Sequence, residues 1–143
     1  MITAYIDGGS RGNPGPAGYG VQIVGDDDAV VAELHGSLAH STNNVAEYHG
    51  LLAALAWAVD HGHKTLHIRS DSELLVKQLR GEYRVKNPGL QPLYQDARAL
   101  VGRLGRVTFE HVRREFNKEA DRLANLAMDE AASAAAKATA SPG

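Results

Sequence analysis

Two periodicities of hydrophobic and polar residues divide the chain into predicted strands and helices. Alternating apolar and polar positions predict five strands, at residues 2–7, 19–24, 29–38, 65–69 and 107–112. Apolar residues at helical spacing predict four helices, at residues 45–59, 74–79, 90–104 and 118–128. The first three strands follow one another through short turns, which predicts an antiparallel meander. Because the later strands alternate with helices, the pattern predicts an α/β protein.

The stretch between the first two strands is rich in glycine. Five glycines lie between Asp7 and Tyr19, and the sequence Asn-Pro-Gly-Pro at residues 13–16 predicts a turn. The first strand is expected to end at Asp7, which places a carboxylate at the mouth of this turn. Taken alone, the stretch is equally well explained as a β-hairpin in which the aspartate serves only the turn.

Three further acids occupy the ends of predicted elements. Glu47 lies in the first turn of a helix that follows the cap residues Thr42, Asn43 and Asn44. Asp71 follows the fourth strand, at the carboxyl end where α/β sheets place ligands. Asp121 lies in the first turn of the last helix.

Each of these acids also has a purely local explanation. A first-turn acid complements the helix dipole. Ser70 and Glu73, which flank Asp71, match a helix capping box, and Asn117 is expected to cap the last helix. Four acids that converge in one fold, however, would repel one another unless cations lay between them. Oxygen ligands in a chain without cysteine favour Mg²⁺ or Mn²⁺, and pairs of such ions serve phosphoryl transfer.

Composition and charge narrow the classes of protein without choosing among them. The 143 residues, 43% of them hydrophobic, suit one domain with a core. No apolar run is long enough to span a bilayer, no secretory signal is visible, and the absence of cysteine suits a reducing cytosol, so a cytoplasmic protein without a membrane partner is expected. Residues 1–60 contain seven acids and one basic residue, whereas basic residues predominate in 61–143. This asymmetry suits an acidic metal site beside a basic contact surface, although ordinary solvated charge explains it too.

Four motifs give the sequence a family resemblance. They read DGGSRGNPGPAGYG, TNNVAEYHGLLAAL, SDSELLVKQL and NKEADRLAN. In order and spacing they resemble the successive motifs of the ribonuclease HI family, over about residues 1–128. The resemblance implies a ribonuclease H-like fold, a five-stranded mixed sheet in the order 3-2-1-4-5 with helices on both faces. Residues 1–128 would form the ribonuclease H domain, and the alanine- and serine-rich residues 129–143 a low-complexity tail or linker.

The resemblance also implies a function. It implies an endoribonuclease that hydrolyses the RNA strand of RNA–DNA hybrids by a two-metal-ion mechanism, leaving 3′-hydroxyl and 5′-phosphate ends. The implied cofactor is a pair of Mg²⁺ ions, with Mn²⁺ as a substitute. The implied catalytic residues and metal ligands are Asp7, Glu47, Asp71 and Asp121. The implied substrate contacts are Gly8, Asn13, Thr42, Asn43 and Asn44, whose polar side chains serve equally well as turn and cap residues.

Two features depart from the family pattern. Many members carry a histidine in a flexible loop before the last catalytic aspartate, but residues 112–117 are short and contain none, which leaves Glu115 or Asn117 as candidates for that role. The basic helix and loop that some bacterial members use to grip the hybrid is also missing after Lys86. A binding module without turnover and another two-metal nuclease, such as a junction resolvase, stay open as alternatives. A monomer is expected, and a fused phosphatase domain, which follows this domain in some relatives, is left open.

Overall fold

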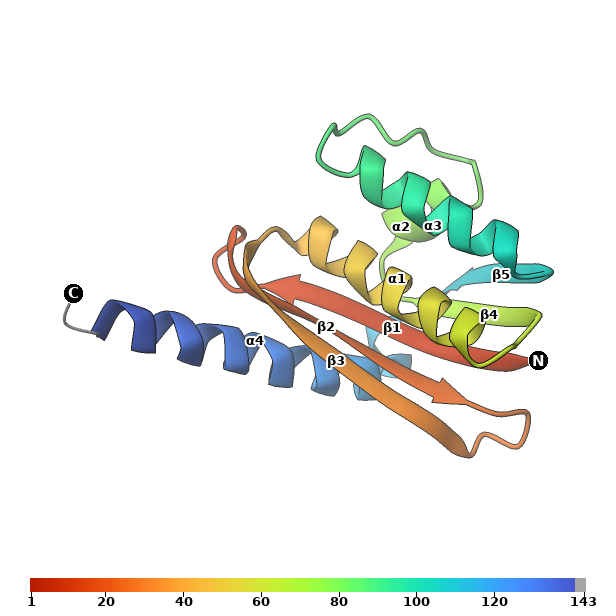
Figure 1. The fold of residues 1–143 in the computed structure, drawn as a ribbon, viewed down its shortest axis with the longest axis horizontal. Coiled ribbons are helices and arrows are strands. Elements are labelled where there is room, and N and C mark those ends of the chain that lie inside the picture. Colours follow the sequence, from red (N-terminus) through yellow and green to blue (C-terminus); the bar gives the residue numbers. More distant parts are fainter. Residues whose placement is uncertain (141–143) are drawn as a thin grey trace.

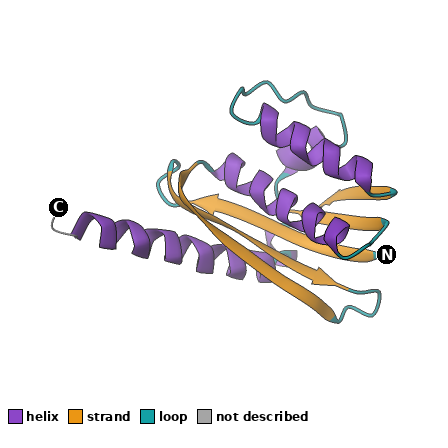
Figure 2. Ribbon diagram, viewed as in Figure 1, coloured by secondary structure: helices purple, strands orange, loops and turns teal. Residues whose placement is uncertain are grey.

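The computed structural model describes residues 1–140, and its centre is the strand β1 (Ile2–Ser10). β1 pairs antiparallel with β2 (Gly15–Val24) and parallel with β4 (Thr65–Ser70). The outer strands are β3 (Val30–Ser41), antiparallel to β2, and β5 (Arg106–His111), parallel to β4. The resulting order β3-β2-β1-β4-β5 confirms both the meander and the five-stranded mixed sheet (Figures 1 and 2).

Helices cover both faces of the sheet. The helices are α1 (Asn43–Asp60), α2 (Glu73–Leu79), α3 (Gln91–Arg103) and α4 (Lys118–Ala140), with a 3-10 turn η1 (Arg114–Phe116) before α4. α1 packs on β1 and β2, and α3 packs on α1 (Figure 1). α4 packs on the other face of β2, β3 and β1. The core between the sheet and α1 contains Ile6, Ile23, Leu51, Leu55, Leu66 and Ile68.

Glycines on β1 and β2 allow both helices to approach the sheet closely. A Cβ atom on Gly8 would lie 2.5 Å from the backbone nitrogen of Glu47 in α1. On the opposite face, a Cβ on Gly20 would lie 2.5 Å from the carbonyl oxygen of Ala120, and one on Gly18 would lie 2.5 Å from the Cβ of Ala127. Real Cβ atoms are not found so close to other heavy atoms, so these positions require glycine.

Two local predictions from the sequence are wrong. β1 does not end at Asp7 but continues to Ser10, because its glycines pair with the equally glycine-rich start of β2. The cap of α2 is Ser72, whose Oγ accepts a hydrogen bond from the Leu75 amide at 3.2 Å, so the capping box between Ser70 and Glu73 does not form. Ser70 Oγ instead accepts a bond from the Ser72 amide at 3.0 Å, which closes the turn before the cap.

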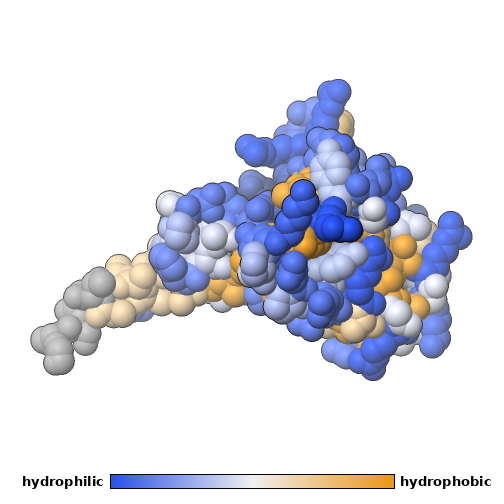
Figure 3. Space-filling view, turned by 90° about the horizontal axis from the view of Figure 1, so that it is seen from above, coloured by the Kyte–Doolittle hydropathy of each residue, from blue (hydrophilic) through white to orange (hydrophobic). Residues whose placement is uncertain are grey.

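The helix α4 extends beyond the expected end of the domain. It continues through residue 140 and projects past the sheet, where its surface is weakly hydrophobic (Figures 1 and 3). Ion pairs anchor it near residue 130, because Arg11 contacts Asp129 at 2.5 Å and His35 contacts Glu130 at 3.1 Å. Beyond this point Ala131 is buried, whereas residues 133–138 are exposed. None of the helices described has the length and hydrophobicity needed to cross a bilayer.

The division into a domain at 1–128 and a linker at 129–143 is a proposal that truncation tests. Removing everything after Glu130 is expected to change the melting temperature by less than about 3 °C, because Ala131 is the buried side chain lost from the described helix. A truncation after Leu126, which also removes the buried Ala127 and Met128, serves as the matched control and should be clearly less stable. A large loss of stability after truncation at Glu130 would mean that the tail belongs to the domain.

Candidate active site

Four carboxylates from four different elements line one open cavity of about 430 Å³. They are Asp7 of β1, Glu47 of α1, Asp71 after β4 and Asp121 of α4. The remaining residues that line the cavity are Gly8, Gly9, Asn43, Asn44, Ser72, Arg114, Asn125 and Met128. The structure therefore brings together all four acids that the sequence singled out.

Two of the acids stand side by side because their strands are parallel neighbours. Ile6 of β1 is aligned with Ser70 of β4, so Asp7 and Asp71 follow at the same level of the sheet. Glu47 reaches this level because α1 lies directly against β1, at the point where Gly8 has no side chain. The missing Cβ of this glycine thus positions one acid relative to another.

Asp121 is connected to β1 through Asn117, which stands at the predicted cap position of α4. Asn117 does not cap α4 with its side chain; its Nδ2 donates a 2.8 Å hydrogen bond to the carbonyl oxygen of Ile6, the residue before Asp7. The backbone of Asn117 accepts a bond from the Asp121 amide at 3.1 Å. One buried residue, 1% exposed, therefore connects the strand that carries Asp7 to the first turn of the helix that carries Asp121.

Burial and mutual repulsion raise the pKa of two of the acids. The pKa of Asp7 is raised to about 8, chiefly by burial and then by the charge of Asp71 and a hydrogen bond with Asp121. The pKa of Glu47 is raised to about 7, again chiefly by burial, and a hydrogen bond from Ser72 partly offsets this. Perturbed pKa values of this kind cluster at functional sites.

The predicted substrate contacts divide into two groups. Gly8, Asn43 and Asn44 line the cavity, whereas Thr42 and Asn13 do not. Thr42 caps α1, since its Oγ1 accepts a bond from the Val45 amide at 3.3 Å, which confirms the predicted cap role.

Asn43 combines a place at the cavity with a structural role. Its Oδ1 accepts a 2.7 Å bond from the Ser10 amide, and its own amide donates a 3.0 Å bond to Asn13 Oδ1. Asn13 therefore acts from the β1–β2 turn by holding Asn43 in place. For Asn44 no such side-chain bond is recorded in the described part of the chain, and its side chain is left to face the cavity.

Two further residues line the cavity that were not among the predicted catalytic and substrate-contact residues. Arg114 of η1 lines the cavity, and Asn125 lines it one helical turn after Asp121, with its Nδ2 bonded to the Asp121 carbonyl at 2.9 Å. The i, i+4 spacing from Asp121 was the available signal for Asn125. Arg114 could be recognised only as part of a basic loop. Glu115 and Asn117, named as substitutes for the missing histidine, do not line this cavity.

The donor set fits hard divalent cations. Carboxylate and amide oxygens are the ligands that Mg²⁺ and Mn²⁺ prefer, and a cation would relieve the repulsion that raises the pKa of Asp7. Within residues 1–140, no three His, Asp or Glu side chains stand close enough together to form a finished metal site. The chemistry of the residues, rather than a preformed ligand geometry, supports a cation here.

Comparisons with known proteins agree with this fold. A family model described as "Reverse transcriptase-like" matches residues 5–127. The bifunctional protein Rv2228c of Mycobacterium tuberculosis is 50% identical over 136 residues, which are 94% of this chain and 37% of that protein. Ribonuclease HI of Halobacterium salinarum is 43% identical over 91% of this chain and 65% of its own length. This chain thus spans little more than a third of the first of these relatives.

Solved structures give the same result. The N-terminal ribonuclease H domain of Rv2228c superimposes with a TM-score of 0.90 and 47% identity, covering 94% of this chain and 97% of that one. LC11-RNase H1, solved in complex with an RNA/DNA hybrid, superimposes with a TM-score of 0.87 and 39% identity, covering 92% of this chain and 99% of that one. With the family model spanning most of the chain and with these relatives, the chain belongs to the ribonuclease HI family.

Proposed function

We propose that this chain is an endoribonuclease that cleaves the RNA strand of RNA–DNA hybrids, leaving 3′-hydroxyl and 5′-phosphate ends. The observation that carries the proposal is the convergence of Asp7, Glu47, Asp71 and Asp121 on one cavity beside asparagine side chains. LC11-RNase H1, with the same fold, was solved with an RNA/DNA hybrid bound. An RNA strand fits the polar rim, because short amides can hydrogen-bond the ribose 2′-hydroxyl that distinguishes RNA from DNA.

The proposed mechanism uses two divalent cations, which Asp7, Glu47, Asp71 and Asp121 would hold. When bound, Mg²⁺ or Mn²⁺ would lower the pKa of a water molecule and neutralise charge that develops on the phosphate. The chain itself does the positioning: Asn43 and Asn44 orient the ribose, while Gly8 presents its backbone at the cavity. Arg114 places a guanidinium at a cavity whose other charged lining residues are acids, where it can bind a phosphate oxygen.

Cleavage of a labelled RNA–DNA hybrid, with Mg²⁺ and with EDTA, tests the proposal. The expected result is endonucleolytic cleavage of the RNA strand alone that EDTA abolishes. Duplex DNA and a four-way junction serve as comparison substrates and should remain intact. Binding of the hybrid without cleavage would favour the binding-module alternative, and junction cleavage would favour another nuclease of this fold.

Replacement of Asn44 by alanine is expected to raise the KM for hybrid about tenfold while the melting temperature changes little. The reason is that its side chain lines the cavity without bracing the loops. Asn43→Ala is the comparison, since it also removes the acceptor of the Ser10 amide and should lower both affinity and stability. Steady-state kinetics and thermal melts separate the two effects, and an unchanged KM for Asn44→Ala would contradict the substrate role.

Location, oligomeric state and domain organisation are the remaining proposals. We propose a cytoplasmic monomer without a membrane partner, which the lack of cysteine and of candidate membrane helices among the described residues supports. A second domain after this one, as the bifunctional relative and the 37% coverage suggest, is also a proposal. Sedimentation of the isolated chain tests the oligomeric state.

A further inference from the structure

A buried hydrogen bond between two side chains joins α1 to α2. The Tyr48 hydroxyl donates to Oε1 of Gln78 at 2.6 Å, and the two residues are 1% and 5% exposed. Tyr48 directly follows Glu47 in the chain, and Gln78 lies in the helix that begins just after Asp71. The bond therefore connects the elements that carry two of the four acids, and the proposed hydrolysis assigns it no role.

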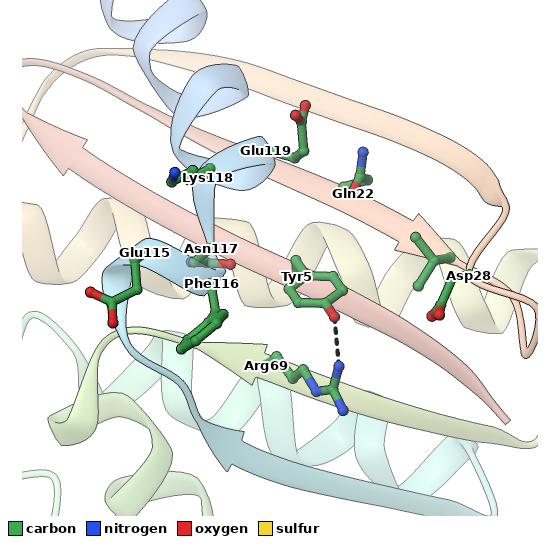
Figure 4. Close-up of a pocket in the computed structure, with 10 residues that line it drawn as sticks. Tyr5, Gln22, Asp28, Arg69, Glu115, Phe116, Asn117, Lys118 and Glu119 are labelled. Atoms are coloured by element: carbon green, nitrogen blue, oxygen red, sulfur yellow. Dashed lines mark hydrogen bonds between the residues drawn. The ribbon is translucent and has the colours of Figure 1, made fainter.

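Asn117 makes the corresponding contact for the other two acids. Its buried amide connects β1, which carries Asp7, to the first turn of α4, which carries Asp121. Figure 4 shows Asn117 against β1 at the start of α4. Each pair of acids is thus accompanied by one buried amide that joins the two elements concerned.

A second hydrogen bond attaches α2 to α1 at the other end of α2. The Ser72 hydroxyl caps α2 and also donates a hydrogen bond to the carboxylate of Glu47. Gln78 lies six residues after Ser72, which corresponds to about 9 Å along the helix axis. The helix α2 is therefore attached to α1 near both of its ends, by Ser72 to Glu47 and by Gln78 to Tyr48.

The helix α2 needs such attachments because it is short. It has seven residues, fewer than the roughly 12–15 that an isolated helix needs in water, and the irregular residues 80–90 follow it. Its apolar side chains Leu75, Val76 and Leu79 are buried, which supplies stability. Apolar packing specifies a position less strictly than a directional hydrogen bond does. The bond between Tyr48 and Gln78 therefore fixes where α2 lies along α1.

A buried glutamine is not the most stable choice for this position. Glutamine is mostly exposed in proteins, and a buried polar side chain is unfavourable unless it is paired. Apolar side chains of similar size in place of both Tyr48 and Gln78 would be about as stable, or more so. A satisfied polar pair instead specifies a single arrangement of the core. The bond thus suits a requirement for precise placement of α2.

We propose that Tyr48 and Gln78 are positioning residues for two of the acids. Their bond sets the distance between Glu47 and Asp71, and through it the affinity of the acidic cavity for divalent cations. Asp71 immediately precedes Ser72, so any movement of α2 along α1 carries the Asp71 carboxylate with it. The inference rests on the proposed function, in which these acids hold cations.

Titration of ¹⁵N-labelled protein with Mg²⁺, without substrate, tests this inference. Tyr48→Phe keeps the ring and removes only the hydroxyl group. It is expected to weaken Mg²⁺ binding about fivefold, as measured by the shifts of the amides at residues 71–73. The Mg²⁺ concentration that gives half-maximal cleavage of the hybrid should rise by the same factor.

The double change Tyr48→Phe with Gln78→Met separates positioning from stability. Tyr48→Phe alone leaves a buried acceptor unpaired and should lower the melting temperature by about 4 °C. Removal of both partners should restore most of this loss, yet Mg²⁺ binding should stay about fivefold weaker, because no directional bond replaces the original one. Ile23→Val is the matched control, since it slightly destabilises the core on β2, on the far side of β1 from β4, and should bind Mg²⁺ normally.

The outcomes distinguish this inference from the proposed function. If the double variant recovered Mg²⁺ binding together with stability, or if all variants bound Mg²⁺ equally, the positioning role would be wrong while the proposed function stood. If the unchanged protein bound no Mg²⁺ at these residues, the proposed function would fail together with the inference.

Discussion

Asp7→Asn is expected to reduce cleavage of an RNA–DNA hybrid by at least about a thousandfold while leaving the fold intact. The side chain lines the acidic cavity, next to Asp71, which follows the neighbouring strand β4, and is bonded to Asp121 of α4. An asparagine preserves the shape but removes the charge on which the proposed binding of cations depends. Cleavage assays with Mg²⁺ measure the loss of activity, and circular dichroism verifies that the fold is intact.

The same variant is expected to be more stable than the original protein in the absence of divalent cations. Folding raises the pKa of Asp7 from 3.8 to about 8, so the stability that this carboxyl contributes is complete below pH 4 and is lost as the pH rises through 8. An asparagine cannot ionise, and the gain should therefore appear at pH 8–9, on the order of 2 kcal/mol, and vanish near pH 4. Thermal melts in EDTA at both pH values measure it.

The exposed Asp96 of α3 supplies a control for this comparison. Asp96→Asn should change neither cleavage nor the pH dependence of melting. If Asp7→Asn cleaved the hybrid at a near-normal rate in Mg²⁺, the assignment of the catalytic cavity would be wrong. If Asp7→Asn cleaved nothing but had the same melting temperature as the original protein at both pH values, the repulsion among the acids would be weaker than the geometry indicates.

Gly20→Ala is expected to destabilise the protein by about 3 kcal/mol, a large share of the stability of a domain of this size. The added Cβ would lie 2.5 Å from the Ala120 carbonyl oxygen, the Ala124 nitrogen and the Leu123 Cβ. Two of these three atoms are helix backbone, so α4 as a whole would have to move away from β2. The displacement carries Asp121 with it, and cleavage at low temperature should fall along with the melting temperature.

Gly102→Ala is the matched control for this change. Gly102 lies in α3, and a Cβ there meets no atom within 4 Å. Alanine is a better helix former than glycine, so this variant should gain up to about 1 kcal/mol and cleave normally. Equal stability of Gly20→Ala and the unchanged protein would show that α4 does not rest on β2 as tightly as described.

The sequence was informative where a pattern is local and less so where a contact is distant. Alternation and helical spacing predicted every strand and main helix, and the ends of these elements identified the four acids that the cavity brings together. The extension of β1 to Ser10 could not be predicted, because it depends on glycines that pair across two strands beneath a helix. Asn117 stands at the predicted cap position of α4, but the bond of its side chain could not be predicted for the same reason, since its partner Ile6 lies 111 positions earlier in the chain.

The contribution of α4 to the cavity has a consequence during protein synthesis. Asp7, Glu47 and Asp71 belong to segments that leave the ribosome early, whereas Asp121 belongs to the last helix. Chains emerge from their N-terminus, so a nascent chain can pair its strands and pack α1 before the fourth acid exists outside the exit tunnel. Under the proposed function, such a chain is inactive. Activity begins only when α4 has packed against the glycines of β2.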